Sequence, residues 1–188
     1  MLKIILSLIL ISILTWCGWN NQTSQDRLTD YFVSSHYDLV TKTLDLSNQD
    51  LSGFITMKWQ LEWLVVNTIN LSNNQIQDID LRSLDTGVWI DLSDNNFKYG
   101  SDILLPPTVR HLDLSNNQLE TLDTLDSYQK IQTINVSHNP LDDESLWFVW
   151  ELSKLKYANI DNTLAWSWFV DKFQWFNAGY LLNNTPIY

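Results

Sequence analysis

An eight-residue pattern recurs six times along this chain, and it constrains the fold more than any other feature of the sequence. Each copy has apolar residues at its first, third and eighth positions. The copies begin at Leu44, Ile69, Ile90, Leu112, Ile134 and Ala158, so neighbouring starts lie 21 to 25 residues apart. A unit of this size cannot bury its own apolar residues. The sequence therefore predicts a stack of coils that share one core over residues 43–165.

Alternation along each copy predicts which side chains point inward. Leu44 and Leu46 are expected to face the core and Asp45 to face outward. The sixth position is also predicted to face inward, and in four copies it is asparagine: Asn74, Asn95, Asn117 and Asn139. We expect these amides to bond backbone groups of the coils above and below, which would be costly to bury unpaired. Their role is therefore interpreted as structural.

The copies LDLSNNQL and INLSNNQI resemble the leucine-rich repeat family, whose pattern is L-x-L-x-x-N-x-L. This resemblance implies an α/β fold of the solenoid type, with short parallel strands on a concave face and irregular or helical returns on the convex side. It also implies protein binding without catalysis. The first and last copies carry Gln49 and Thr163 in place of the asparagine, as expected of capping repeats.

The segments around the strands are predicted from their apolar spacing. Residues 26–42 form a candidate amino-terminal cap, an amphipathic helix that includes Leu28, Tyr31, Phe32 and Leu39. Residues 142–155 are predicted to be helical, since three acidic residues favour a helix start and an apolar stripe continues to Leu155. The aromatic residues 166–188 are predicted to be the carboxyl-terminal cap. Pro106 and Pro107 exclude a long helix from their return.

Outward positions of the strands define the surface that a partner would contact. This surface is polar and mildly acidic, and Trp89, His111 and Tyr157 are its aromatic residues. The serines that stand two residues after each outward Asp or Asn, from Ser47 to Ser137, are expected on the same face. Candidate partner-binding residues are Asp45, Asn70, Trp89, Asp91, His111, Asp113, Thr133, Asn135 and Tyr157. The alternative is that they are ordinary solvated strand positions.

Charge and motif content exclude several functions. The net charge of −11 argues against nucleic acid as a partner. Phosphate-binding glycine loops, nucleophile elbows and histidine pairs at metal-binding spacing are absent from the sequence. His111 beside Asp91 and Asp113 is the one arrangement that suggests acid–base or metal chemistry. We expect no cofactor, no metal and no enzymatic activity.

The amino terminus predicts export. Residues 1–16 have one lysine and then an apolar run, which is typical of a signal peptide, and residues 17–25 form a polar tether. Leu14, Thr15 and Cys17 resemble a bacterial lipoprotein signal, although Trp16 stands where that family has a small residue. The resemblance implies cleavage before Cys17 and a lipid on its sulfur. An ordinary signal peptide or an uncleaved anchor is the alternative.

Ten tryptophans against five glycines is an unusual balance. If each tryptophan were glycine, the segment before Cys17 would become a well-formed lipoprotein signal. We therefore hypothesise that a codon read as glycine in the source was translated as tryptophan. The alternative is a genuinely tryptophan-rich protein. Whether residue 89 is tryptophan or glycine depends on which is correct.

Together these features predict a three-part chain: the signal peptide, the tether, and a repeat domain over residues 26–188. The expected function is non-catalytic protein binding at the bacterial cell surface, from a membrane-anchored lipoprotein or a secreted form. Adhesion, or binding of carbohydrate or cell-envelope material by a structural lipoprotein, is the alternative.

Overall fold

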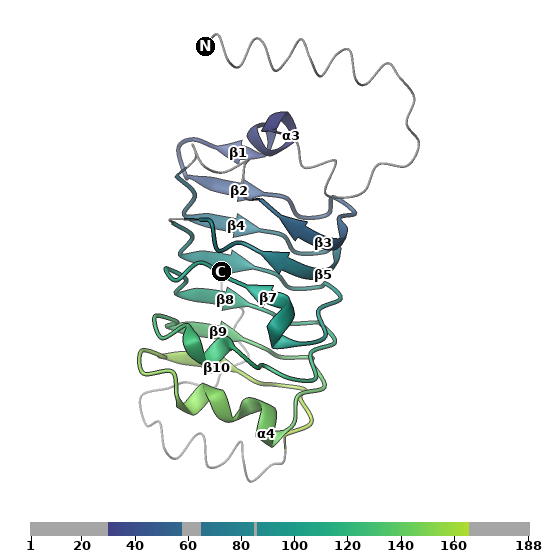
Figure 1. Cartoon of the computed structure of the whole chain (residues 1–188), viewed down its shortest axis with the longest axis vertical. Helices are drawn as coiled ribbons and strands as arrows, with labels where there is room; N and C mark the ends of the chain where they lie inside the picture. Colours follow the sequence, from purple (N-terminus) through teal and green to yellow (C-terminus); the bar gives the residue numbers. More distant parts are fainter. Residues whose placement is uncertain (1–29, 58–64, 85, 166–188) are drawn as a thin grey trace.

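The computed structural model describes residues 30–57, 65–84 and 86–165, and there the chain winds into a stack of coils (Figure 1). One side of the stack is a seven-stranded sheet in the order β1-β2-β4-β6-β8-β9-β10. Its strands are β1 (Tyr37–Asp38), β2 (Thr43–Asp45), β4 (Thr68–Asn70), β6 (Trp89–Asp91), β8 (His111–Asp113), β9 (Thr133–Asn135) and β10 (Tyr157–Asn159). From β2 to β10 every pairing is parallel, whereas β1 pairs antiparallel with β2. The predicted α/β solenoid is confirmed.

The register of the sheet follows the repeats. Leu44 lies opposite Ile69, and the corresponding residues of the later coils continue the row to Ala158. These residues are buried in one continuous apolar core that extends from Val33 to Ile160. Burying this apolar surface is the main favourable contribution to folding. No single coil could bury its apolar residues alone, so the coils depend on their neighbours for stability.

A ladder of buried amides joins the turns that follow the strands. Oδ1 of Asn117 accepts a hydrogen bond from the backbone N–H of Phe97 in the preceding coil at 3.1 Å. Its Nδ2 donates to the carbonyl of Leu92 in that coil at 3.0 Å, and to those of Leu114 and Ser115 in its own coil. Equivalent bonds are made by Asn74, Asn95 and Asn139.

These bonds differ in one respect from the expectation drawn from the sequence. Each amide bonds its own coil and the coil before it, rather than the coils on both sides. The reason is that every asparagine side chain points toward the turn of the preceding coil, away from the coil that follows. The residue just before each ladder position has a left-handed backbone, as at Asn116 with φ of 54° and His138 with φ of 57°. Asparagine, aspartate and histidine tolerate that region better than most residues.

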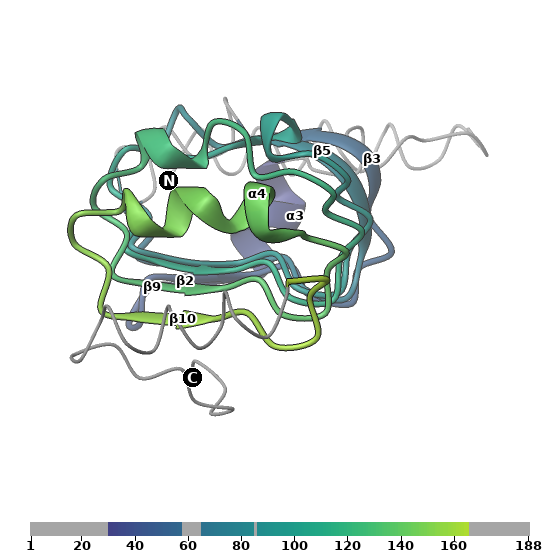
Figure 2. The ribbon, with the colours of Figure 1, turned by 90° about the horizontal axis from the view of Figure 1, so that it is seen from below.

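The return side of the stack is not uniform (Figures 1 and 2). Near the amino-terminal end it forms a second parallel sheet of β3 (Ser52–Thr56), β5 (Gln75–Asp80) and β7 (Ile103–Leu104), preceded at β7 by the short η1 (Gly100–Asp102). Later coils return through helical turns instead. This second sheet lies outside what we expected, because the repeat pattern carries no signal for it.

The helix predicted over residues 142–155 is shorter than expected. It begins as predicted, with Asp142 accepting a hydrogen bond from Ser145 N–H at 2.9 Å, but α4 (Asp143–Leu146) continues only as the 3₁₀ segment η3 (Trp147–Trp150). A similar 3₁₀ turn, η2 (Leu125–Ser127), occupies the coil before it. Leu152 and Leu155 are buried as predicted. The helix ends early because the chain turns back into β10, which begins at Tyr157.

The amino-terminal cap also differs from the prediction. α3 (Asp30–Ser35) ends before β1, and Leu39 is 79% exposed in the turn between β1 and β2 instead of lying on a buried helical face. Among the side chains of α3 that the structure describes, that of Val33 is buried in the core. Signal peptide, tether, Cys17 and the cap over residues 166–188 lie outside the described residues, so those divisions stay predictions. Within the described part, no helix is both long and apolar enough to cross a membrane.

Candidate functional site

The outward surface of strands β2 to β10, here called the strand face, carries two columns of side chains. The first column is formed by the residue that begins each strand: Thr43, Thr68, Trp89, His111, Thr133 and Tyr157. All six are partly buried, since each is flanked by its neighbours on the adjoining strands. Two large rings occupy the middle of the column, between threonines on both sides.

Trp89 and His111 form a stacked pair on neighbouring strands. Their ring centroids lie 3.9 Å apart with an angle of 17° between the planes. His111 Nδ1 also lies 2.8 Å from the hydroxyl oxygen of Thr133 on the next strand. Partial burial, with the positive charges of Arg110 and Lys156 nearby, lowers the pKa of His111. The lowered pKa favours the neutral form of the imidazole, and the stacked pair forms an aromatic platform.

Tyr157 does not join this platform. It lies opposite Thr133, so one full strand separates it from His111. The aromatic group predicted from the sequence is thus a pair with a separate third ring. Neighbouring strands lie about 4.8 Å apart, so rings two strands apart do not stack.

The second column is formed by the last residue of each strand, and it has a structural role. Asp91 Oδ1 accepts hydrogen bonds from both the backbone N–H and the hydroxyl of Ser93, at 2.9 Å and 2.7 Å. The other coils make the same side-chain-to-backbone contact two residues on, at Asp45, Asn70, Asp113, Asn135 and Asn159. Aspartate and asparagine recur here because they can close this turn. The sequence analysis missed this role, although the presence of aspartate or asparagine at this position in all six copies was a signal for it.

Two parts of the predicted contact surface are in fact inside the molecule. Asn135 is only 7% exposed and donates to Asp113 Oδ2 at 3.0 Å, so it is not available to a partner. Ser72, Ser93, Ser115 and Ser137 are likewise buried, which makes the prediction of an exposed serine column wrong for them. The chain bends inward toward the ladder directly after each strand, and this bend removes the serines from the surface.

Burial also changes the charge properties of the face. The pKa of Asp91 is raised mainly by its burial, and the hydrogen bonds from Ser93 oppose that change only in part. Asp113 and Asp45 raise it further through their negative charge. Asp45, by contrast, is exposed at the end of the face, beside a groove of about 470 Å³ that it lines with His36, Tyr37 and Asp38.

The arrangement offers little for chemistry. His111 bonds Thr133 rather than either neighbouring aspartate, so no acid–base pair is formed. Among residues 30–57, 65–84 and 86–165, no three histidine, cysteine or acidic side chains come together as a metal site would require. The strand face thus carries an aromatic platform with a polar border, and it shows no metal-binding cluster within the described residues.

Comparison with known proteins gives a match for one coil. Residues 108–127, which contain β8 and Asn117, match the model of the Leucine Rich Repeat family. Among solved structures the chain is similar to an internalin from Listeria monocytogenes str. 4b F2365, with 18% sequence identity and a TM-score of 0.48. That likeness covers 54% of this chain and 30% of the internalin chain, so this chain spans less than a third of the internalin. No curated protein sequence matches the chain.

Proposed function

We propose that this chain, a leucine-rich repeat protein, binds a partner protein on its strand face at the Trp89–His111 platform. Proteins of this repeat class are typically interaction modules rather than enzymes. The stacked pair is the observation that supports the site most directly, since it is an aromatic platform on an otherwise polar surface. Aromatic side chains that are already held in place lose little entropy on binding and commonly dominate the energy of an interface.

The hydrogen bonds of the second column reduce the number of residues on the strand face that are available to a partner. Its oxygens already close the turns after the strands, so they are less free to recognise a partner. Recognition is then assigned to the first column, with Thr68 and Thr133 flanking the platform. A partner would gain the most by placing an apolar or planar group against Trp89 and His111.

We also propose that binding takes place outside the cytoplasm, with Cys17 carrying lipid. The apolar run of residues 1–16 and the polar residues after Cys17 support this proposal. Peptide mass spectrometry on protein from the native cells tests it. An acylated Cys17 as the first residue is expected, and a retained signal peptide or a free cysteine would contradict the anchor. The same measurement reads position 89, where a glycine mass would remove the platform.

Site-directed photocrosslinking tests the binding site. A photoreactive amino acid at Thr68, beside Trp89, should give one saturable protein adduct on intact cells. The same group at Gln118, an exposed turn residue after β8, is the matched control and should give none. Excess unlabelled wild-type protein should abolish the adduct, whereas the Trp89→Ala, His111→Ala variant should not.

Other outcomes separate the alternatives. An adduct of polysaccharide or cell-wall material at Thr68 would favour the carbohydrate- or envelope-binding function instead. Equal protein adducts from Thr68 and Gln118 would show that the strand face is not the site.

A further inference from the structure

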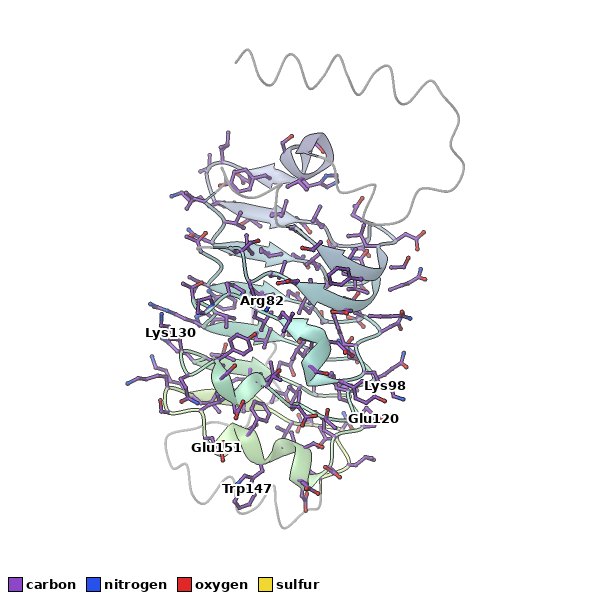
Figure 3. The ribbon with its side chains drawn as sticks, viewed as in Figure 1. Arg82, Lys98, Glu120, Lys130, Trp147 and Glu151 are labelled. Carbon is purple, nitrogen blue, oxygen red and sulfur yellow. The ribbon has the colours of Figure 1, made fainter. Side chains whose placement is uncertain are left out.

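Four positive side chains gather beside the strand face, where the strands begin. Arg110, Lys130, Lys154 and Lys156 are all exposed, and they alternate with Val109, Ile131 and Leu155, which are buried. Burial of the alternate residues fixes the direction of the cations, so all four point outward. We call these four side chains the basic edge. Figure 3 shows Lys130 at this edge and Lys98 with Glu120 at the opposite edge.

Backbone hydrogen bonds place the cations on neighbouring coils. The N–H of Gln132 donates to the carbonyl of Arg110 at 2.7 Å, and the N–H of Lys156 donates to the carbonyl of Gln132 at 2.7 Å. Arg110, Gln132 and Lys156 therefore form one row across three coils. Lys130 and Lys154 each lie two residues before a member of that row, in the turns that lead into β9 and β10.

Stability does not explain this grouping. Of the other cations in the described residues, Arg82 and Lys98 are paired with Asp80 and Glu120, whereas Lys42, beside β2 at the far end of the sheet, forms no ion pair there. No member of the basic edge forms an ion pair there. Like charges on adjacent strands repel one another and destabilise the fold slightly. On a chain of net charge −11, a group of four exposed cations is a candidate surface for an acidic partner.

The spacing of the cations fits an extended peptide. Lys154 and Lys156 lie two residues apart where the chain leaves a turn and enters β10. An extended segment alongside also presents every second side chain on one face. Three of the four cations are lysines, whose single ammonium groups suit separate carboxylates better than a two-pronged contact to one phosphate.

The basic edge adjoins the aromatic platform. Arg110 directly precedes His111, and the positive charges of Arg110 and Lys156 both act on that imidazole. A partner seated on Trp89 and His111 would reach the edge without a second docking event. Charged borders of this kind mainly increase the association rate and set the orientation of a partner.

We propose that the basic edge binds an extended acidic segment of the partner protein, with alternate carboxylates facing Lys130, Lys154 and Lys156. This inference rests on the proposed function, because it describes the border of the same interface. It assigns the partner a chemical property: a run of alternating acidic residues beside the group that contacts the platform.

Fluorescence anisotropy with two labelled peptides tests the inference on the full chain. One peptide alternates glutamate and serine, and the other has the same composition with its glutamates in one block. Ionic strength is kept near 0.15 M, where a Debye length of about 8 Å limits repulsion from the rest of the acidic chain. The variant is Lys130→Glu, Lys154→Glu. The control, Arg82→Glu, Lys98→Glu, changes the net charge equally away from the edge, and thermal melts check that both fold.

Tighter binding of the alternating peptide by the wild type is expected, with about a tenfold loss in the edge variant and about twofold or less in the control. Equal binding by all three proteins, or none by the wild type, would overturn the inference. So would binding of inorganic polyphosphate or phosphatidylglycerol vesicles through the same lysines without binding of the peptide. The photocrosslink at Thr68 does not depend on these lysines, so failure of the peptide test leaves the proposed function standing.

Discussion

On the strand side of the stack, the coils from β2 to β10 each add three residues in the same register, whereas the return side changes character along its length. Near α3 the return is the parallel sheet β3-β5-β7, and near α4 it is a series of helical turns. The same core lies beneath both. The difference shows that the two sides of a coil are constrained in different ways.

The strand side is constrained by hydrogen bonding between coils. Each strand from β2 to β9 pairs with two neighbours, and each ladder amide must reach the turn before it, so the residue at every position is restricted. The return side has to cross the width of the coil and bury a few apolar residues, such as Leu122 and Leu125. Several backbone conformations satisfy that requirement, and the contacts of each return with its neighbours select among them.

The largest effect is expected from breaking the ladder on the strand side. Asn117→Leu removes four hydrogen bonds and leaves the N–H of Phe97 and three carbonyl groups buried without this partner. We expect a loss of about 3–5 kcal/mol in the free energy of unfolding, measured by urea denaturation. Gln118→Ala, at the exposed neighbouring position, should change it by about 0.5 kcal/mol or less. Similar losses in both variants would show that the ladder is not what distinguishes the strand side.

A smaller effect is expected from the helical part of the return side. Asp142→Ala removes the side chain that accepts from Ser145 N–H at the start of α4, and it should cost about 1 kcal/mol. That hydrogen bond lowers the pKa of Asp142. Its contribution is therefore present at neutral pH and is lost as the pH falls through the lowered value. Thermal unfolding against pH should show the two proteins converging in acid.

The control for this prediction is Asp142→Asn, which keeps an acceptor at the cap and should be close to the wild type at neutral pH. If both substitutions cost the same, charge rather than the cap hydrogen bond holds α4. A cost for Asp142→Ala as large as that of Asn117→Leu would remove the contrast between the two sides.

The smallest effect is expected in the second column of the strand face. Burial raises the pKa of Asp91 above its ordinary value of 3.8, so the folded chain holds this proton more tightly than the unfolded chain does. Its contribution to stability is greatest in acid and falls as the pH rises from below 3.8 through the raised folded value. Asp91→Asn keeps the acceptor for Ser93 N–H and removes the buried charge.

We expect Asp91→Asn to stabilise the fold by roughly a few tenths of a kcal/mol at neutral pH, with no gain in acid below both pKa values. The midpoint of thermal unfolding at several pH values measures this. Asp45→Asn, at the corresponding position of β2 where the side chain is exposed, should change the midpoint little. A loss of stability at neutral pH would mean that the hydrogen bonds from Ser93 outweigh the burial of the charge.

The repeat pattern by itself determined the strand side. Its apolar positions predicted the strands, the continuous core and the inward position of Asn74, Asn95, Asn117 and Asn139, and its resemblance to leucine-rich repeats implied that the strands are parallel. It could do so because a period of 21 to 25 residues leaves one way to bury the recurring apolar residues. It also predicted that Trp89 and His111 would lie on neighbouring strands.

Tertiary structure alone decided the rest. The second sheet, the early end of α4, the exposure of Leu39 and the burial of Asn135 depend on contacts between coils, for which the one-dimensional pattern has no signal. The same holds for the stacking of Trp89 on His111 and for the grouping of Lys130, Lys154 and Lys156. Residues more than 20 positions apart become neighbours only when the coils stack, and side-chain packing then decides which of them reach the surface.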